Sequence, residues 1–342
     1  MPTAGSTVFL SCLGSSDVRL NINTSVGRVI ADPTYLAVLH LGAHTLTITQ
    51  ELKIPSASQL DAGTGLVQFN GTVTCNTPAE LYDLEILGNG TITPVQNVLV
   101  GQNLTLTGVN IIGNCSNGNI LVKGNLVSND ATGWAGGSCG NWAYVVLNGS
   151  GDQTVSGTGK WANMEVNKPS GNVLLSSNLD FVSGATLKGV ATSVVATSPG
   201  RLRTGGNMTF DYAGTVDDVE LLGNGTIALI QDLKVEDTLT VSAVNIIGNC
   251  SSGNIRVKGH LISNDANGWA GGSCGSWAYV VLTGADDQQI SGTGKWANLS
   301  VSKPSGYVLM SSNVDIISGG NLSGTALAQM KNYPGRFRTM GN

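Results

Sequence analysis

A stretch of fifteen residues that occurs twice constrains this chain more than any other feature. Residues 133–147 read GWAGGSCGNWAYVVL, and residues 268–282 read GWAGGSCGSWAYVVL, a shift of 135 positions. The same shift relates residues 168–171 to 303–306 without an insertion. The chain therefore contains a tandem duplication, and we expect the two stretches to occupy equivalent places in a fold in which each repeat buries its apolar face against its neighbours.

A shorter and weaker repeat lies inside each copy. The sequence Ile86-Leu87-Gly88-Asn89 returns as residues 111–114, which are 25 positions further on, and Trp134 precedes Trp161 by 27 positions. This predicts a repeat of about 25 to 28 residues, and therefore about five coils per copy and around a dozen in the chain. A repeat of this size fits one coil of a parallel β-helix with two or three short strands.

The composition favours the same fold. The chain has 47 glycines, 11% charged residues and 41% hydrophobic residues, which argues against disorder. Strong helix formers are scarce, whereas Val, Ile and Thr alternate between Gly, Asn and Ser, with Asn-Gly pairs such as Asn89-Gly90 and Asn148-Gly149 at the expected corners. We therefore predict an all-β chain that forms a right-handed parallel β-helix, or β-solenoid. We divide it into an N-terminal β-rich section (1–71), a first solenoid unit (72–207) and a second solenoid unit (208–342).

Charge and hydropathy limit the partners that we expect. The net charge is −5 and no basic cluster occurs, so nucleic acid is not an expected partner. The longest apolar runs, such as residues 144–147, are too short to cross a bilayer, so we expect no membrane insertion. The first ten residues lack a positive n-region and a long apolar region, which is not the pattern of a secretory signal peptide.

Four of the six cysteines form duplicated pairs. Cys115 and Cys139 are 24 positions apart, as are Cys250 and Cys274. This separation is close to the expected coil length, and adjacent strands lie about 4.8 Å apart, so each pair is a candidate disulfide between neighbouring coils. The alternative is that all four are small buried thiols in the core.

The histidines do not indicate a metal site. His40 and His44 are spaced i and i+4, but Gly42 lies between them in a β-rich segment, and the third histidine, His260, is remote in sequence. No Cys-x2-Cys spacing occurs. We therefore expect neither a metal nor another cofactor.

The segment after each tryptophan-rich stretch carries a resemblance. Residues 157–175 read GTGKWANMEVNKPSGNVLL, and residues 292–310 are the counterpart. This resembles the coil pattern "aromatic, Asn, hydrophobic, x, Val/Ile, Asn, Lys, x, x, Gly, x, Val, x, Leu" of β-solenoid adhesins and fibre proteins of bacteria and their phages. The resemblance covers about the last three quarters of the chain and implies an extended, non-enzymatic protein that is secreted or attached to a virion. The two tryptophans and the cysteine of residues 133–147 depart from that pattern.

Some β-solenoid proteins cleave polysaccharides, and hydrolysis of a glycosidic bond requires two suitably placed carboxyl groups. The candidate pairs are Asp130 with Asp152, Asp265 with Asp287, and Asp180 with Glu165. However, Asn129-Asp130 and its copy Asn264-Asp265 precede a glycine and a tryptophan, which is typical of turn residues that bind local backbone. No Ser/His/Asp set is apparent either. We therefore expect no catalytic residues.

Six tryptophans are the candidate binding residues. Exposed aromatic rings on a stiff scaffold can bind sugar rings or a partner chain, and the alternative is that they fill the wide end of a coil. The residues are Trp134, Trp142, Trp161, Trp269, Trp277 and Trp296.

Together these features predict a structural fibre or an adhesive rod. We expect a phage virion fibre first, a bacterial surface adhesin or extracellular filament second, and a polysaccharide-cleaving tailspike third. The expected partners are copies of the chain itself, other fibre subunits and possible surface carbohydrate, and the expected location is the virion, the extracellular space or the cell surface. Residues 336–339 match the interior residues 201–204, where further strand follows, so we expect another polypeptide to cover the C-terminal coil.

Overall fold

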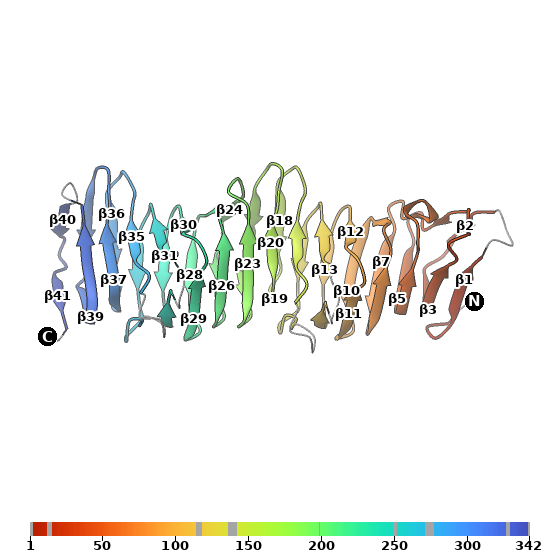
Figure 1. The fold of residues 1–342 in the computed structure, drawn as a ribbon, viewed down its shortest axis with the longest axis horizontal. Coiled ribbons are helices and arrows are strands. Elements are labelled where there is room, and N and C mark those ends of the chain that lie inside the picture. Colours follow the sequence, from red (N-terminus) through yellow and green to blue (C-terminus); the bar gives the residue numbers. More distant parts are fainter. Residues whose placement is uncertain are drawn as a thin grey trace. The chain divides into compact units, whose positions relative to one another are not determined.

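The computed structural model consists of parallel strands stacked in successive coils (Figure 1). It describes residues 3–11, 16–113, 118–135, 142–197, 199–248, 252–270, 277–325 and 329–340. The fold is a β-solenoid of about 15 turns, so the predicted parallel β-helix is confirmed. Within the described residues, the only helical segment is one 3-10 turn, η1 (Ala57–Gln59). The chain divides into two compact units, Met1–Gly171 and Asn172–Asn342. This division follows packing, whereas the boundary at 207/208 follows the sequence repeat.

The first unit begins with strands that already pair as coils, since β1 pairs with β3, β3 with β5, and β2 with β4 and then β6. These strands are β1 (Thr7–Leu10), β2 (Val18–Arg19), β3 (Thr24–Ala31), β4 (Leu39–His40), β5 (Thr45–Lys53) and β6 (Leu60–Asp61). Three walls follow. The first contains β9 (Glu80–Leu81), β12 (Val98–Val100), β15 (Ile120–Val122), β17 (Val145–Leu147) and β20 (Met164–Val166). The second contains β7 (Leu66–Asn70), β10 (Asp83–Leu87), β13 (Leu104–Leu106), β16 (Leu126–Ser128) and β18 (Gln153–Ser156). The third contains β8 (Val73–Asn76), β11 (Gly90–Pro94) and β14 (Val109–Ile112), and β19 (Lys160–Trp161) comes later in the chain.

The second unit repeats the arrangement. One wall contains β21 (Val173–Leu175), β24 (Val194–Thr197), β27 (Thr215–Val216), β30 (Leu233–Val235), β33 (Ile255–Val257) and β35 (Val280–Leu282). Another contains β22 (Leu179–Phe181), β25 (Leu202–Arg203), β28 (Val219–Leu221), β31 (Leu239–Val241), β34 (Leu261–Ser263), β36 (Gln288–Ser291), β38 (Tyr307–Met310) and β40 (Gln329–Asn332). A third contains β23 (Ala185–Gly189), β26 (Met208–Tyr212), β29 (Gly225–Leu229) and β32 (Val244–Ile247). The last coils contain the longer β37 (Lys295–Val301) and β39 (Val314–Gly324), followed by β41 (Phe337–Thr339).

Strand register gives the coil length. In the second unit, one ladder passes from Val195 to Gly324 in six coils, and its partners are spaced 19 to 25 positions apart. The expected repeat of about 25 to 28 residues is therefore too long for most coils, and the duplicated segment makes about six coils rather than five. The error has a simple origin. Ile86 pairs with Leu106, whereas Ile111 pairs with Thr91, so the weak sequence repeat compares strands on different walls.

The core consists of ladders of aliphatic side chains. Leu84 pairs with Leu104, Leu104 pairs with Leu126, and Leu126 pairs with Val155. Each of these four side chains is at most 1% exposed. Along each strand, residues that alternate with these buried ones are partly exposed. This matches the alternation expected of a strand with one face toward the core and one toward solvent. Each such side chain contributes about 1.5–3 kcal/mol of hydrophobic stabilisation, so the ladders supply much of the stability of a coil.

Asparagines at the corners connect successive coils. Asn89 adopts a left-handed conformation, with φ of 50°, next to Gly90 as the sequence indicates. The Oδ1 atom of Asn103 accepts the backbone N–H of Asn125 (3.3 Å), and the Oδ1 atom of Asn125 accepts the N–H of Thr154 (2.8 Å). These bonds join a side chain to the backbone of the next coil, and each contributes about 0.5–1.5 kcal/mol.

Candidate functional site

The coil that carries the duplicated stretch is organised by a buried aspartate. Asp130 is 4% exposed, and its Oδ2 atom accepts the N–H of Val109 (2.9 Å) from the preceding coil. Its Oδ1 atom accepts the N–H groups of Thr132 (3.0 Å) and Gly133 (3.3 Å). Gly133 has φ of 67°, a value that glycine adopts without strain. The carboxylate thus closes a turn and ties two coils together, as expected of a turn residue.

The second copy repeats this geometry. Asp265 is also 4% exposed and accepts the N–H of Val244 (2.9 Å) at Oδ2, and those of Asn267 (3.0 Å) and Gly268 (3.2 Å) at Oδ1. The residues after each turn form matching parallel bridges, Ile111 with Ala135 and Ile246 with Ala270. The described residues at the start of the two stretches therefore occupy equivalent places within their units.

Four of the six tryptophans fill the core behind these turns. Trp134 and Trp161 meet edge to face, with ring centroids 5.8 Å apart, and Trp269 and Trp296 do the same at 5.7 Å. All four are at most 1% exposed. Their rings consequently have no face open to a sugar or a partner. These four tryptophans instead fill the interior of a coil, which was the alternative to a binding role. Such pairs add about 0.5–1.5 kcal/mol beyond burial.

The remaining two tryptophans, Trp142 and Trp277, are partly exposed. Each lies beside an asparagine of the next coil, since the backbone oxygen of Trp142 accepts from Asn163 Nδ2 (3.4 Å) and that of Trp277 from Asn298 Nδ2 (3.5 Å). Of the predicted aromatic platform, these two residues remain candidates for binding.

Other proposed catalytic carboxylates also have structural partners. Asp180 forms a two-pronged ion pair with Arg203, whose Nε and Nη2 atoms lie 2.5 and 2.7 Å from its oxygens. This contact raises the pKa of Arg203. Asp287 accepts the backbone N–H of Tyr307 (2.8 Å) at Oδ1. An acid or base that is already held in this way is poorly placed to exchange a proton with a substrate.

A buried lysine in each copy was not expected from the sequence. Lys168 is 3% exposed, and its ammonium donates to the backbone oxygens of Gly149 (3.0 Å) and Gly151 (2.7 Å) and to Gln153 Oε1 (2.7 Å). Gln153 in turn donates to the oxygen of Val122 (2.9 Å) in the preceding coil. All three ammonium protons are thereby used, which offsets the cost of burying the charge.

The second copy has the same cage around Lys303, which donates to Gly284 O (2.8 Å), Asp286 O (2.7 Å) and Gln288 Oε1 (2.9 Å). Burial lowers the pKa of both lysines, and nearby aspartates partly oppose the shift. The Lys-Pro-Ser-Gly sequence, which recurs in the second copy, was the available signal. It did not reveal the role, because the acceptors are mainly backbone oxygens.

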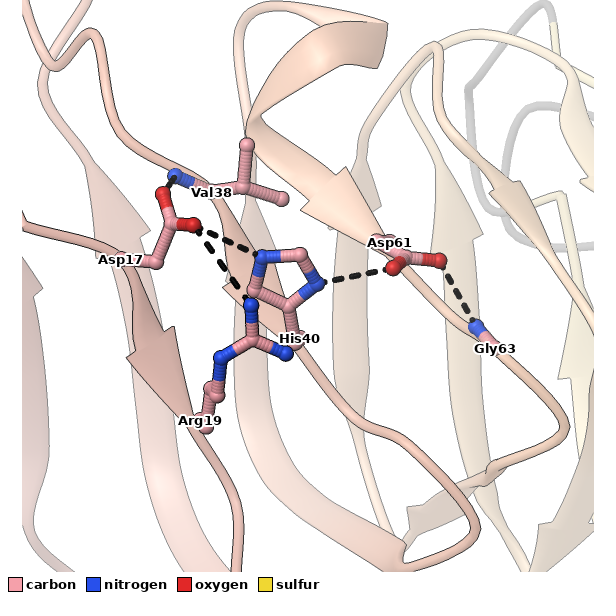
Figure 2. Close-up of polar contacts among 6 residues, drawn as sticks. All are labelled: Asp17, Arg19, Val38, His40, Asp61 and Gly63. Carbon is pink, nitrogen blue, oxygen red and sulfur yellow. Dashed lines mark hydrogen bonds and ion pairs between the residues drawn. The ribbon is translucent and has the colours of Figure 1, made fainter.

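The N-terminal section holds the other polar cluster, formed by Asp17, His40 and Asp61 (Figure 2). His40 Nδ1 lies 2.8 Å from Asp61 Oδ2, and His40 Nε2 lies 3.1 Å from Asp17 Oδ2. The second oxygen of each carboxylate accepts a backbone N–H, from Val38 to Asp17 (3.0 Å) and from Gly63 to Asp61 (3.0 Å). The cluster thus spans three paired strands, since Asp17 directly precedes β2, His40 lies in β4 and Asp61 lies in β6.

The charges of this cluster support one another. Hydrogen bonds to Asp61 and then Asp17 raise the pKa of His40. The bond to His40 and that to the Gly63 N–H lower the pKa of Asp61, and the bonds to the Val38 N–H and His40 lower that of Asp17. Both ring nitrogens are occupied, so His40 has no free nitrogen to act as a general base. The arrangement suits a protonated His40 whose two hydrogen bonds link neighbouring coils.

The spacing of this cluster was a usable sequence signal. Asp17 and His40 are 23 positions apart, and His40 and Asp61 are 21 positions apart, which is one coil in each case. This spacing was not detected from the sequence, because a longer repeat of about 25 to 28 residues was expected there. His44, which the sequence places near His40, takes no part in the cluster.

The candidate disulfides lie outside the described residues, since Cys115, Cys139, Cys250 and Cys274 all fall in the gaps. Cys75 is a free, buried thiol, and burial raises its pKa to about 12. Among the residues that the structure describes, no three His, Cys, Asp or Glu side chains are arranged to hold a metal ion. In the same part of the chain, no helix is long and apolar enough to cross a membrane.

No protein-family model, no curated protein and no solved structure matches this chain.

Proposed function

We propose that this chain is a non-enzymatic structural segment of a fibre, located on a virion or on a cell surface, and that its coils continue into neighbouring fibre material. This role could be carried out in a virion fibre, a surface adhesin or an extracellular filament. Stacked coils with a core of aliphatic ladders suit this role, because stability then accumulates coil by coil along the stack.

The observation that carries the proposal is the use of the duplicated polar groups. Asp130 and Asp265 bind backbone N–H groups of two coils, and Lys168 and Lys303 bind backbone oxygens. Asp180 is paired with Arg203. Groups that would carry acid–base chemistry therefore contribute to joining coils, which favours a structural role over polysaccharide cleavage.

An open strand edge supports continuation of the coils. β41 pairs with β39, and within the described residues no strand pairs with its other side. The equivalent strand of the first copy, β25, pairs with both β22 and β28. Accordingly Leu202 is fully buried, whereas its counterpart Phe337 is 37% exposed. An uncovered edge with an apolar side chain is a template for a further strand, such as one from another subunit.

Sedimentation velocity over a range of concentrations tests this proposal. We expect the chain to associate as its concentration rises, and Phe337→Asp to remain monomeric because a charge replaces the apolar contact. Leu174→Asp is the matched control, since Leu174 is 36% exposed on β21 and away from this edge. A chain that stays monomeric while residues 336–340 are protected from hydrogen exchange would contradict the proposal.

A further inference from the structure

An open pocket of about 390 Å³ lies on the second unit, beside the partly exposed Trp277. Its lining consists of Trp277, Tyr279, Asn298, Gly319 and Asn321. Asn298 lies in β37 and pairs with Asn321 in β39, and Tyr279 directly precedes β35, whose Val280 pairs with Leu299. Three successive coils therefore each contribute one polar side chain to the same column.

Hydrogen bonds hold this column in place. Asn298 Oδ1 accepts the backbone N–H of Asn321 (3.1 Å), and Asn321 Nδ2 donates to the hydroxyl oxygen of Tyr279 (2.8 Å) across two coils. The hydroxyl proton of Tyr279 and the Oδ1 atom of Asn321 have no partner among the described residues. The pocket thus presents the hydroxyl of Tyr279 and the amide of Asn321, which can donate and accept hydrogen bonds, next to an indole ring.

The chemistry of the lining selects the class of ligand. No lysine, arginine or carboxylate lines the pocket, so nothing there compensates a phosphate, a uronic acid or an amine. An aromatic ring beside fixed hydroxyl and amide groups matches a pyranose, which has C–H groups on its faces and hydroxyls at its edge. We propose that this pocket binds a neutral hexose unit of a polysaccharide. The inference does not depend on the proposed structural function.

The duplication supplies an internal comparison. Trp142, Tyr144 and Asn163 stand in the first copy where Trp277, Tyr279 and Asn298 stand in the second, but Thr186 replaces Asn321. Threonine has no amide group that could donate to the tyrosine hydroxyl. The variant Asn321→Thr therefore gives the second copy a side chain that the first copy already carries at this position, and we expect it to fold.

Calorimetric titration of the whole chain with maltohexaose, cellohexaose and laminarihexaose tests the proposal, with hexagalacturonate as the charged comparison. The chain is produced in a bacterial host without N-glycosylation, so that Asn321-Leu322-Ser323 stays unmodified. We expect at least one neutral oligomer to bind. Trp277→Ala should weaken that binding about tenfold or more, and Asn321→Thr and Tyr279→Phe should each weaken it severalfold. Phe9→Ala is the control and should leave it unchanged, since Phe9 is an exposed aromatic residue that does not line the pocket.

The proposal fails if none of the three neutral oligomers binds at about 10 mM. It also fails if hexagalacturonate binds as well as they do, or if Asn321→Thr and Trp277→Ala both bind like the parent chain. Hydrogen exchange of β35 and β37 confirms that each variant is folded. Association of the chain in sedimentation is measured separately, so failure of the fibre proposal and failure of this one are distinguishable.

Discussion

Removal of the Asp130 carboxylate should loosen the coil that contains Trp134 without affecting any chemistry. In Asp130→Ala, the N–H of Val109 loses its acceptor at a position that is fully buried, and the N–H of Gly133 loses a longer bond. Each buried donor left without a partner costs about 1–3 kcal/mol. Water can replace the bonds to the exposed Thr132, and the long bond to Gly133 (3.3 Å) contributes only about 1 kcal/mol, so the total loss is about 2–4 kcal/mol.

Hydrogen exchange is the appropriate assay, because stacked coils open locally rather than all at once. We expect the amides of β14 and of residues 159–160 to exchange about 30 to 1000 times faster in Asp130→Ala. Asp130→Asn retains one acceptor oxygen and should show a smaller effect. The control is Asp286→Ala, which removes an exposed carboxylate but retains the backbone oxygen bound by Lys303.

Two results would refute this reasoning. One is exchange in Asp130→Ala that equals the exchange of the parent chain. The other is a polysaccharide-cleaving activity that disappears in the double variant of Asp130 and Asp265 while the protection of β14 persists. The second result would assign the aspartates to catalysis.

The polar clusters and the cysteines lead to three further predictions. Lys303→Met should destabilise its coil by about 1–3 kcal/mol, because it leaves buried oxygen atoms without a donor. Hydrogen exchange near Gln288 measures this loss. Lys303→Arg should not retain the parent stability, because the cage fits an ammonium group. Protection of residues 38–41 should be greatest between about pH 4 and 6.5. The pKa of His40 is raised in the folded chain. The stabilisation that His40 contributes is therefore complete below its pKa in the unfolded chain and is lost as the pH rises through its pKa in the folded chain. The pKa values of Asp17 and Asp61 are lowered, so the stabilisation from these carboxylates is present above about pH 3.8 and is lost on acidification. His40→Gln should abolish the loss of protection at higher pH. If protection still falls at higher pH in this variant, the assignment to His40 is contradicted. Mass spectrometry of unreduced peptides should find Cys115 with Cys139 and Cys250 with Cys274, and any other pairing would refute the disulfide prediction.

The fold was predictable because its determinants are local and repeated. Alternating apolar residues and glycine or asparagine corners indicate short strands, and the aspartate before each Gly-Trp sequence is typical of a turn. The coil length was less accessible, since residues that resemble one another, such as Ile86 and Ile111, need not pair. Register depends on the three-dimensional stacking of walls, which a weak sequence repeat does not specify.

The exposure of the tryptophans and the contacts of the polar clusters could not be predicted from the sequence alone. Trp134 and Trp277 are each followed by an alanine, yet Trp134 is buried and Trp277 is partly exposed, because the stacking of the coils decides which face is covered. The cage of Lys168 is formed mainly by backbone oxygens, which carry no sequence signature. By contrast, the spacing of Asp17, His40 and Asp61 becomes informative once the coil length is known.

The most direct test of the proposed fibre role is cryo-electron microscopy of the chain at a concentration at which it associates. We expect filaments in which strands run across the filament axis and successive coils repeat along it at about 4.8 Å. Phe337→Asp should abolish these filaments. Discrete closed particles, or filaments in which the contact does not involve the β41 edge, would contradict the account.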